Sequence, residues 1–322
     1  PCGLSMPHLK TTTDLPLPSN AFIMVQPILT RVLGPRAAFA PPLVALVVAL
    51  QLQAADTVPA PIASHPIPLE RAHAHNDYLH PRPLLDALDC GFCSVEADVL
   101  LVNDDLFVAH DRIRIRPDRT LTGLYLEPLK RRIQTNGGRV YRDGPPCYLL
   151  IDLKTEADPT YAVLHRQLSA YADILTHYSN GYVKPGAVTV IVSGNRPRST
   201  IAAQSLRYAA CDGIREDFDS EVPKALVPLI SERWGNFFTW RGTGPLPEKD
   251  AATLKALLDK AHARGRQVRF WGAPDNPETW DALYSAGVDL INTDRLTGLR
   301  DFLLAKQGSS TATTRVSVPI PR

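Results

Sequence analysis

Short apolar segments alternate with helical patterns along most of this chain. Apolar periodicity indicates helices at residues 81–89, 158–176, 249–264, 277–286 and 296–305. Eight other segments have the length and composition of strands, at residues 71–75, 94–100, 149–154, 188–193, 211–214, 227–231, 267–271 and 289–293. Eight strands alternating with helices close into a (β/α)8 TIM barrel. We therefore predict an α/β fold with a TIM barrel over residues 70–306, distorted near a long insertion with basic and Gly-rich patches at 112–147.

The segments on either side of the predicted barrel differ from it in composition. After Met24, the expected start, two arginines precede an apolar run at residues 37–50, and small residues follow. This order is typical of a secretory signal cleaved near Ala54 or Ala55, which predicts a secreted or periplasmic protein. A membrane anchor and mitochondrial targeting stay open as alternatives. The predicted layout is an upstream extension with a signal-like segment at 1–55, a linker at 56–69, the barrel, and a disordered Ser/Thr-rich tail at 307–322.

The net charge bears on nucleic-acid binding, and the cysteine content bears on disulfide formation. The formal net charge is only +2, so the composition implies no broad nucleic-acid-binding surface. Spacing does not determine disulfide pairing, so disulfides and buried free thiols both stay open. The cysteines concerned are Cys90, Cys93, Cys147 and Cys211.

The stretch from Arg71 to Asp111 carries polar side chains at alternate positions. His73 and His75 form one such pair, and Glu96 and Asp98 form another. Residues i and i+2 of a strand point to the same face, so each pair aims at one site. Two buried carboxylates suit a hard divalent cation, Mg²⁺ or Ca²⁺, although ion pairs with Arg or Lys are the alternative. With histidines to move protons and no evident Ser or Cys nucleophile, the pattern favours metal-assisted phosphodiester chemistry.

Six strings, in order, extend this pattern over residues 73–296. They are HAHNDY (73–78), SVEADV (94–99), VAHD (108–111), LLIDLK (149–154), RFWGAPDNP (269–277) and VDLINTDRL (288–296). Together they resemble the glycerophosphodiester phosphodiesterase and phosphatidylinositol-phospholipase-C superfamily, in the branch that includes altered inheritance of mitochondria protein 6. The resemblance implies a phosphoric diester hydrolase with catalytic residues His75 and His110 and metal ligands Glu96, Asp98 and Asp152.

Two of these positions depart from the superfamily pattern. Many phosphodiesterases of the group have Arg directly after the first catalytic histidine, where this chain has Asn76, and often Glu where it has Asp152. Asn76 can bind phosphate without adding charge. Lys154 is a candidate for the missing cation, with a structural ion pair as the alternative.

Two further residues keep more than one interpretation. Trp271 either lines the mouth of the substrate site or packs the top of the barrel. His73 is open as a ligand, an orienting residue or a packing residue.

The predicted function is hydrolysis of a glycerophosphodiester or phospholipid headgroup ester, with one bound divalent cation and two-histidine acid–base catalysis. The expected partners are a phosphodiester small molecule or phospholipid, with transient contact to a membrane surface, and no nucleic acid. One alternative is a metal-dependent hydrolase of the amidohydrolase or polymerase-and-histidinol-phosphatase type, suggested by His73-x-His75. The other is a catalytically inactive barrel that binds a phosphate ligand.

Overall fold

The computed structural model describes residues 65–313, with side chains through residue 308. The signal-like segment, the proposed cleavage point, most of the linker and residues 314–322 lie outside this range. Among the described residues, no helix has both the length and the apolar character needed to cross a membrane.

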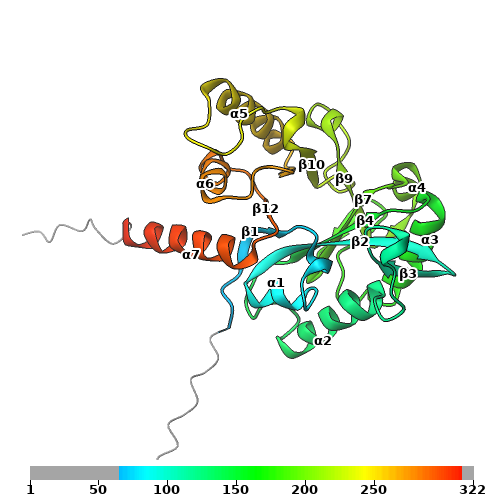
Figure 1. Ribbon diagram of the computed structural model, residues 1–322. Coiled ribbons are helices and arrows are strands. Elements are labelled where there is room, and N and C mark those ends of the chain that lie inside the picture. The colour runs from blue at the N-terminus through cyan, green and yellow to red at the C-terminus, as the bar shows by residue number, and fades with distance from the viewer. Residues whose placement is uncertain (1–64, 314–322) are drawn as a thin grey trace, which may run out of the picture. The chain divides into compact units, whose positions relative to one another are not determined.

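Eight parallel strands form the barrel (Figure 1). Their hydrogen-bonded order is β11-β10-β9-β7-β4-β2-β1-β12, and a parallel bridge between Arg269 and Leu290 joins the two ends. The predicted (β/α)8 barrel is thereby confirmed. The strands are β1 (Leu69–Ala74), β2 (Phe92–Val102), β4 (Cys147–Leu153), β7 (Val188–Gly194), β9 (Ala209–Gly213), β10 (Leu229–Arg233), β11 (Gln267–Trp271) and β12 (Ile291–Thr293).

Side-chain alternation along the strands separates two buried regions. On β2, Val95, Ala97 and Val99 belong to the large core that includes buried residues of the surrounding helices. Glu96, between them, pairs in register with Leu150 of β4. A separate small cluster of leucines and isoleucine fills the barrel below the polar residues: Leu150, Ile191, Leu229 and Leu290. The barrel is thus packed in its lower part and polar toward the strand ends.

Helices follow most of the strands. They are α1 (Leu85–Asp89), α3 (Ala157–Ser169), α4 (Arg198–Ala203), α5 (Glu248–Ala263), α6 (Pro277–Ala286) and α7 (Leu296–Thr313). The predicted bounds of α6 are confirmed: Asn276 accepts a hydrogen bond from the Thr279 amide at its start, and Gly287 ends it with φ 92°. The prediction of disorder after Gln307 is wrong for residues 308–313, because α7 continues through them. Buried Leu299 and Leu303 anchor this helix, and each added residue then extends it cheaply.

The insertion at 112–147 contains a helix that the sequence analysis did not predict. A π-helical turn (Thr122–Leu126) leads directly into α2 (Glu127–Thr135). Leu129 and Ile133, four residues apart, are buried in the core, while arginines occupy other positions of the helix. Those arginines obscured the apolar stripe in the sequence.

Antiparallel pairs add to the barrel. The predicted hairpin is present as β3 (Asp105–Val108), which pairs with the end of β2. A small separate sheet was not predicted, because its strands are only two or three residues long. It consists of β5 (His177–Ser179), β6 (Tyr182–Lys184) and β8 (Leu206–Arg207).

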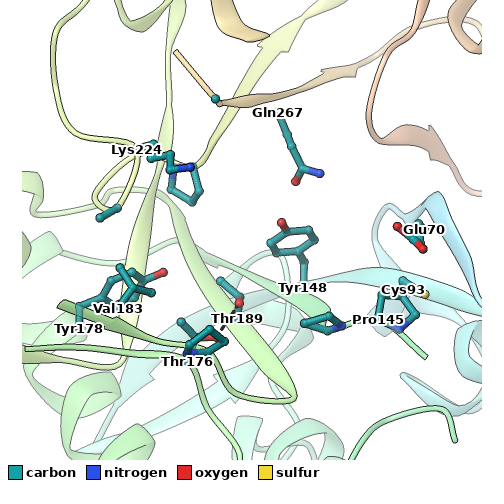
Figure 2. A pocket seen from close by; sticks show the side chains of 15 residues that line it. Glu70, Cys93, Pro145, Tyr148, Thr176, Tyr178, Val183, Thr189, Lys224 and Gln267 are labelled. Atoms are coloured by element: carbon teal, nitrogen blue, oxygen red, sulfur yellow. Dashed lines mark hydrogen bonds between the residues drawn. The ribbon is translucent and has the colours of Figure 1, made fainter. Parts of the chain in front are cut away.

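A cavity of about 540 Å³ lies at the amino-terminal ends of the strands (Figure 2). The Tyr148 ring occupies its centre, and Glu70 and Lys224 stand at opposite sides of it. No group of three metal-ligating side chains lies there: within the described part of the chain, the one such group is at the other end of the barrel. The chemistry predicted from the sequence therefore belongs to that other end.

Candidate active site

A second cavity, of about 460 Å³, is located at the carboxyl-terminal ends of the strands. TIM barrels carry their active sites at this end. Every residue predicted for the site lines this cavity: His75, Asn76, Glu96, Asp98, His110, Asp152, Lys154 and Trp271. His73 does not line it, because its side chain is fully buried beneath.

Strand register brings the three predicted metal ligands together. Asp98 of β2 pairs directly with Asp152 of β4, and Glu96 lies two residues earlier on the same face of β2. One carboxylate oxygen from each residue lies within 4.8 Å of the others. Asp98 Oδ1 is buried and has no hydrogen-bond partner among the described residues. A buried carboxylate oxygen needs such a partner, and a cation held by these three residues would supply one.

A positively charged side chain also contacts one of these carboxylates. Arg269 of β11 donates to Glu96 Oε2 at 2.7 Å. Burial opposes ionisation of Glu96, but Arg269 and His73 outweigh it and hold the Glu96 pKa well below its usual range. The ion-pair interpretation of Glu96 is therefore correct for this partner, and the oxygens of the triad remain close enough for a shared cation. Arg269 was missed in the sequence, where its alternation with Trp271 was the available signal.

His73 acts on Arg269 rather than on the cavity. His73 Nε2 contacts the Arg269 guanidinium and lies 3.1 Å from Glu96 Oε2. On the other side of the ring, His73 Nδ1 lies 2.7 Å from Ser94 Oγ. Burial and the charge of Arg269 lower the His73 pKa to about 3, which keeps the ring neutral. Of the three interpretations, the structure supports the orienting role.

The two predicted catalytic histidines are each held by a carboxylate. His75 follows β1, and its Nδ1 lies 2.9 Å from Asp294 Oδ1. His110 follows β3, and its Nδ1 lies 2.8 Å from Asp98 Oδ2. A carboxylate only accepts, so each Nδ1 carries hydrogen and each Nε2 is left to exchange protons. The hydrogen bond from His75 lowers the Asp294 pKa below its usual range, which keeps that anchor charged.

The HAHNDY string folds into a turn that divides its side chains between site and core. Asn76 adopts a left-handed conformation (φ 48°) that Asn tolerates, and it faces the cavity. Tyr78 places its hydroxyl 2.7 Å from Asp98 Oδ2 and 2.9 Å from Asn76 Oδ1. Asp77 points inward, where its Oδ2 accepts hydrogen bonds from the Leu84 amide and the Tyr125 hydroxyl. Burial raises the Asp77 pKa to about 6.

Lys154 forms ion pairs with two carboxylates of the acidic cluster. Its Nζ lies 3.2 Å from both Asp98 Oδ2 and Asp152 Oδ1. Burial lowers the Lys154 pKa, but the two carboxylates outweigh burial and raise the pKa above its usual value. Lys154 therefore carries its charge within the acidic cluster, as in the ion-pair interpretation.

Other polar residues at the site were missed because they lie singly at strand ends. Arg196 follows β7, and Arg233 ends β10 beside Trp271, which is 39% exposed. Ser193 and Asp212 also line the cavity. Burial raises the Asp212 pKa to about 7.

The four cysteines of the barrel are free and buried, so the free-thiol interpretation is correct for them. The thiols of Cys93 and Cys147 lie next to each other on neighbouring strands. Their hydrogen bond, with burial, raises the Cys147 pKa well above its usual range. Neither cysteine lines the cavity at the carboxyl-terminal ends of the strands.

Comparison with known proteins identifies two family models and several relatives. Residues 62–211 match the family model of the AIM6-like phosphodiesterase domain, and residues 267–297 match that of the glycerophosphoryl diester phosphodiesterase family. An altered inheritance of mitochondria protein 6 homolog from Arthroderma benhamiae is 29% identical over 81% of this chain and 94% of that protein. Altered inheritance of mitochondria protein 6 from Eremothecium gossypii is 30% identical over 73% of this chain and 69% of that protein.

Solved structures of glycerophosphodiester phosphodiesterases also match. The enzyme from Parabacteroides distasonis superposes with a TM-score of 0.42 at 14% identity, covering 74% of this chain and 98% of that one. The enzyme from Agrobacterium tumefaciens gives a TM-score of 0.43 at 15% identity, covering 73% and 99%.

Proposed function

The chain belongs to the altered inheritance of mitochondria protein 6 family, and we propose that it is a metal-dependent phosphoric diester hydrolase acting on a glycerophosphodiester or a phospholipid headgroup ester. One observation carries the proposal. Three carboxylates with mutually close oxygens share a cavity with two histidines, and a carboxylate holds Nδ1 of each ring. That combination supplies a cation seat and two proton carriers, which phosphodiester cleavage requires.

Glu96, Asp98 and Asp152 would hold the cation, Mg²⁺ or Ca²⁺. The all-oxygen donor set and the buried, unpartnered Asp98 Oδ1 fit a hard divalent ion. When bound, such an ion polarises a phosphoryl oxygen and offsets the charge that develops on it. Asp98 has a second task, because its other oxygen orients His110.

The two histidines divide the proton transfers. One takes a proton from the attacking hydroxyl, and the other gives a proton to the leaving oxygen. The attacking hydroxyl belongs to the substrate, vicinal to the phosphate, so the first product is a cyclic phosphodiester. Ser193 and Ser231 line the cavity, but neither hydroxyl bonds a histidine within residues 65–313. An unactivated serine is a weak nucleophile, whereas a bound substrate hydroxyl already has high effective molarity.

The amidohydrolase-type alternative lacks support from the geometry. Such a site needs further histidine ligands, but His165, His177 and His262 do not line the cavity. His177 lies on β5, and His262 Nε2 lies 2.8 Å from Asp289 Oδ2.

Turnover tests the proposal directly. Purified protein is incubated with glycerophosphodiesters, phosphoinositides and sphingomyelin in Mg²⁺, in Ca²⁺ and in chelator. We expect metal-dependent release of the headgroup from at least one diester, and loss of release in Glu96→Gln. Absence of turnover with every substrate and metal, in protein that folds, would identify an inactive phosphate-binding barrel instead.

Export and membrane contact belong to the same proposal. A phospholipid substrate would require transient contact with a membrane surface, and the signal-like segment would direct the protein out of the cell or into the periplasm. N-terminal sequencing of protein from its native host should find a start near Ala54 or Ala55. A folded product that retains residue 24 would contradict cleavage.

A further inference from the structure

We infer that the cavity selects a polyol headgroup, such as glycerol or inositol, and discriminates against a quaternary ammonium headgroup such as choline. This inference deepens the proposed function and rests on it for the identity of the substrate. Two independent features of the cavity carry it. One is the placement of arginines around its single indole, and the other is a pair of buried polar atoms that lack partners.

The indole of Trp271 is already associated with a cation. Arg233 and Trp271 are paired in register on neighbouring strands β10 and β11. The Arg233 guanidinium carbon lies 5.7 Å from the indole centroid. Proteins recognise quaternary ammonium groups through aromatic faces, and Trp271 is the one Trp, Tyr or Phe among the residues that line this cavity. A choline group at this indole would therefore meet the like charge of Arg233.

Two arginines of the cavity have no carboxylate partner. Arg269 is paired with Glu96, and Lys154 with Asp98 and Asp152. Over the described range, Arg196 and Arg233 make no ion pair, and Arg196 donates only to the nearby Gly194 carbonyl. Arg196 acts electrostatically on Asp212, so its charge is partly offset, whereas the charge of Arg233 beside Trp271 favours a neutral or anionic group over a cation at this side of the cavity.

The nearest carboxylate on β10 does not offset this charge freely. Glu232, which lies next to Arg233, is 8% exposed. Its Oε1 accepts from the Arg215 amide and its Oε2 from Asn236 Nδ2, each at 2.9 Å. Both oxygens thus have protein partners, which leaves Glu232 poorly placed to hold a choline group.

Two other atoms suit hydroxyl groups. Asp212 Oδ1 and Ser193 Oγ are buried and have no partner among the described residues. Both residues line the cavity, Asp212 at 3% and Ser193 at 5% exposure. A hydroxyl both donates and accepts, so it can satisfy Asp212 Oδ1 in either protonation state of that carboxyl, whereas a phosphate oxygen only accepts. Glycerol and inositol offer hydroxyls, whereas choline offers none and would leave these atoms unpaired, which a polar site penalises strongly.

Binding tests the inference with a matched pair of ligands, glycerophosphoinositol and glycerophosphocholine. They share the glycerol phosphate half and differ only in the headgroup. Calorimetry in Mg²⁺ on the His75→Ala/His110→Ala protein measures affinity without turnover. We expect the inositol diester to bind at least about tenfold more tightly, since tenfold corresponds to one good polar contact. Equal affinities, or tighter binding of the choline diester, would overturn the inference.

Two variants locate the selectivity. Arg233→Gln should strengthen choline diester binding and reduce the ratio of affinities to about threefold or less. Asp212→Asn should weaken the inositol diester and leave the choline diester unchanged. Arg241→Gln, at an exposed arginine outside the cavity, is the matched control and should keep the full ratio. A ratio unaffected by both cavity variants would contradict the assignment. Because the readout is binding, the selectivity is decided separately from turnover: a selective protein that hydrolyses no diester would refute only the proposed function.

Discussion

Arg269 reaches across the barrel from β11 to donate to Glu96 on β2, with 2.7 Å between Nη1 and Oε2. Both side chains are buried, and the neutral His73 ring holds the same guanidinium. The bond joins two strands that are not hydrogen-bonded neighbours in the sheet. The ionisation of Glu96, a proposed metal ligand, therefore depends on Arg269, which itself lines the cavity.

Removing this arginine should make the stability of the protein depend on metal. In Arg269→Gln, Glu96 loses its ionic partner inside the barrel, which should cost about 3–5 kcal/mol of unfolding free energy in chelator. A cation bound at Glu96, Asp98 and Asp152 would restore much of the loss. Denaturant unfolding in chelator and in Mg²⁺ or Ca²⁺ measures both effects, with Arg241→Gln as the surface control. An equal loss with and without metal would argue against a cation at Glu96.

Each catalytic histidine should matter singly, and the pair should act together. His75→Ala and His110→Ala should each lower kcat by about 10²–10⁴-fold, the usual contribution of a positioned acid or base. The double variant should fall short of the product of the two losses, because both rings serve one reaction. Steady-state kinetics on the best substrate measures the three rates. Near-normal kcat in either single variant would remove that ring from the scheme.

Orientation of the rings can be tested apart from their presence. Asp294→Asn keeps the size of the side chain that holds His75 Nδ1 but removes its charge. We expect kcat to fall by about 10-fold or more, but by less than in His75→Ala, because the ring stays while the anion that holds its Nδ1 is lost. An unchanged kcat would show that Asp294 does not orient His75.

Removing the vicinal hydroxyl of the substrate should abolish most turnover. A deoxy or methylated diester with the same leaving group lacks the intramolecular nucleophile, so its high effective molarity is lost. Phosphorus NMR of the normal substrate should show a cyclic phosphate early in the reaction. Equal rates on the deoxy diester, with solvent oxygen in the first product, would instead indicate direct attack by water.

Asp77 should make stability depend on pH below neutrality. Burial raises its pKa from the ordinary value of 3.8 to about 6, so the folded protein holds an extra proton between these values. The free energy of unfolding should therefore fall as pH rises from about 4 to 6, by about 3 kcal/mol at 1.36 kcal/mol per pKa unit. Asp77→Asn lacks this titration, so the stability difference between it and the wild type should shift over that window. Asp118→Asn, at an exposed site, is the control, and parallel pH curves for Asp77→Asn and the wild type would contradict the expectation.

Local patterns were sufficient for the strands and for two residues of the triad. Glu96 and Asp98 interrupt an otherwise apolar strand, and alternation alone predicts that they share a face, whereas Asp152 joined them in the sequence only through the family resemblance. The helix α2 was not predicted, because only two apolar residues, Leu129 and Ile133, mark its buried side among charged neighbours. Short strands such as β5 were not predicted either, since two or three residues show no periodicity.

The sequence by itself determined the barrel, because strand and helix patterns depend on residue type and local spacing, and the resemblance of its motifs singled out the acidic triad and the two histidines that the barrel places in one cavity. Only the tertiary structure decided which partners those residues have. Arg269 meets Glu96, Asp294 holds His75, and Arg233 covers Trp271 through the register and closure of strands that are distant in the chain. Lys154 was open between phosphate and ion pair until its distances to two carboxylates were known. Electrostatic partnership depends on distance and burial in three dimensions, which spacing along the chain does not encode.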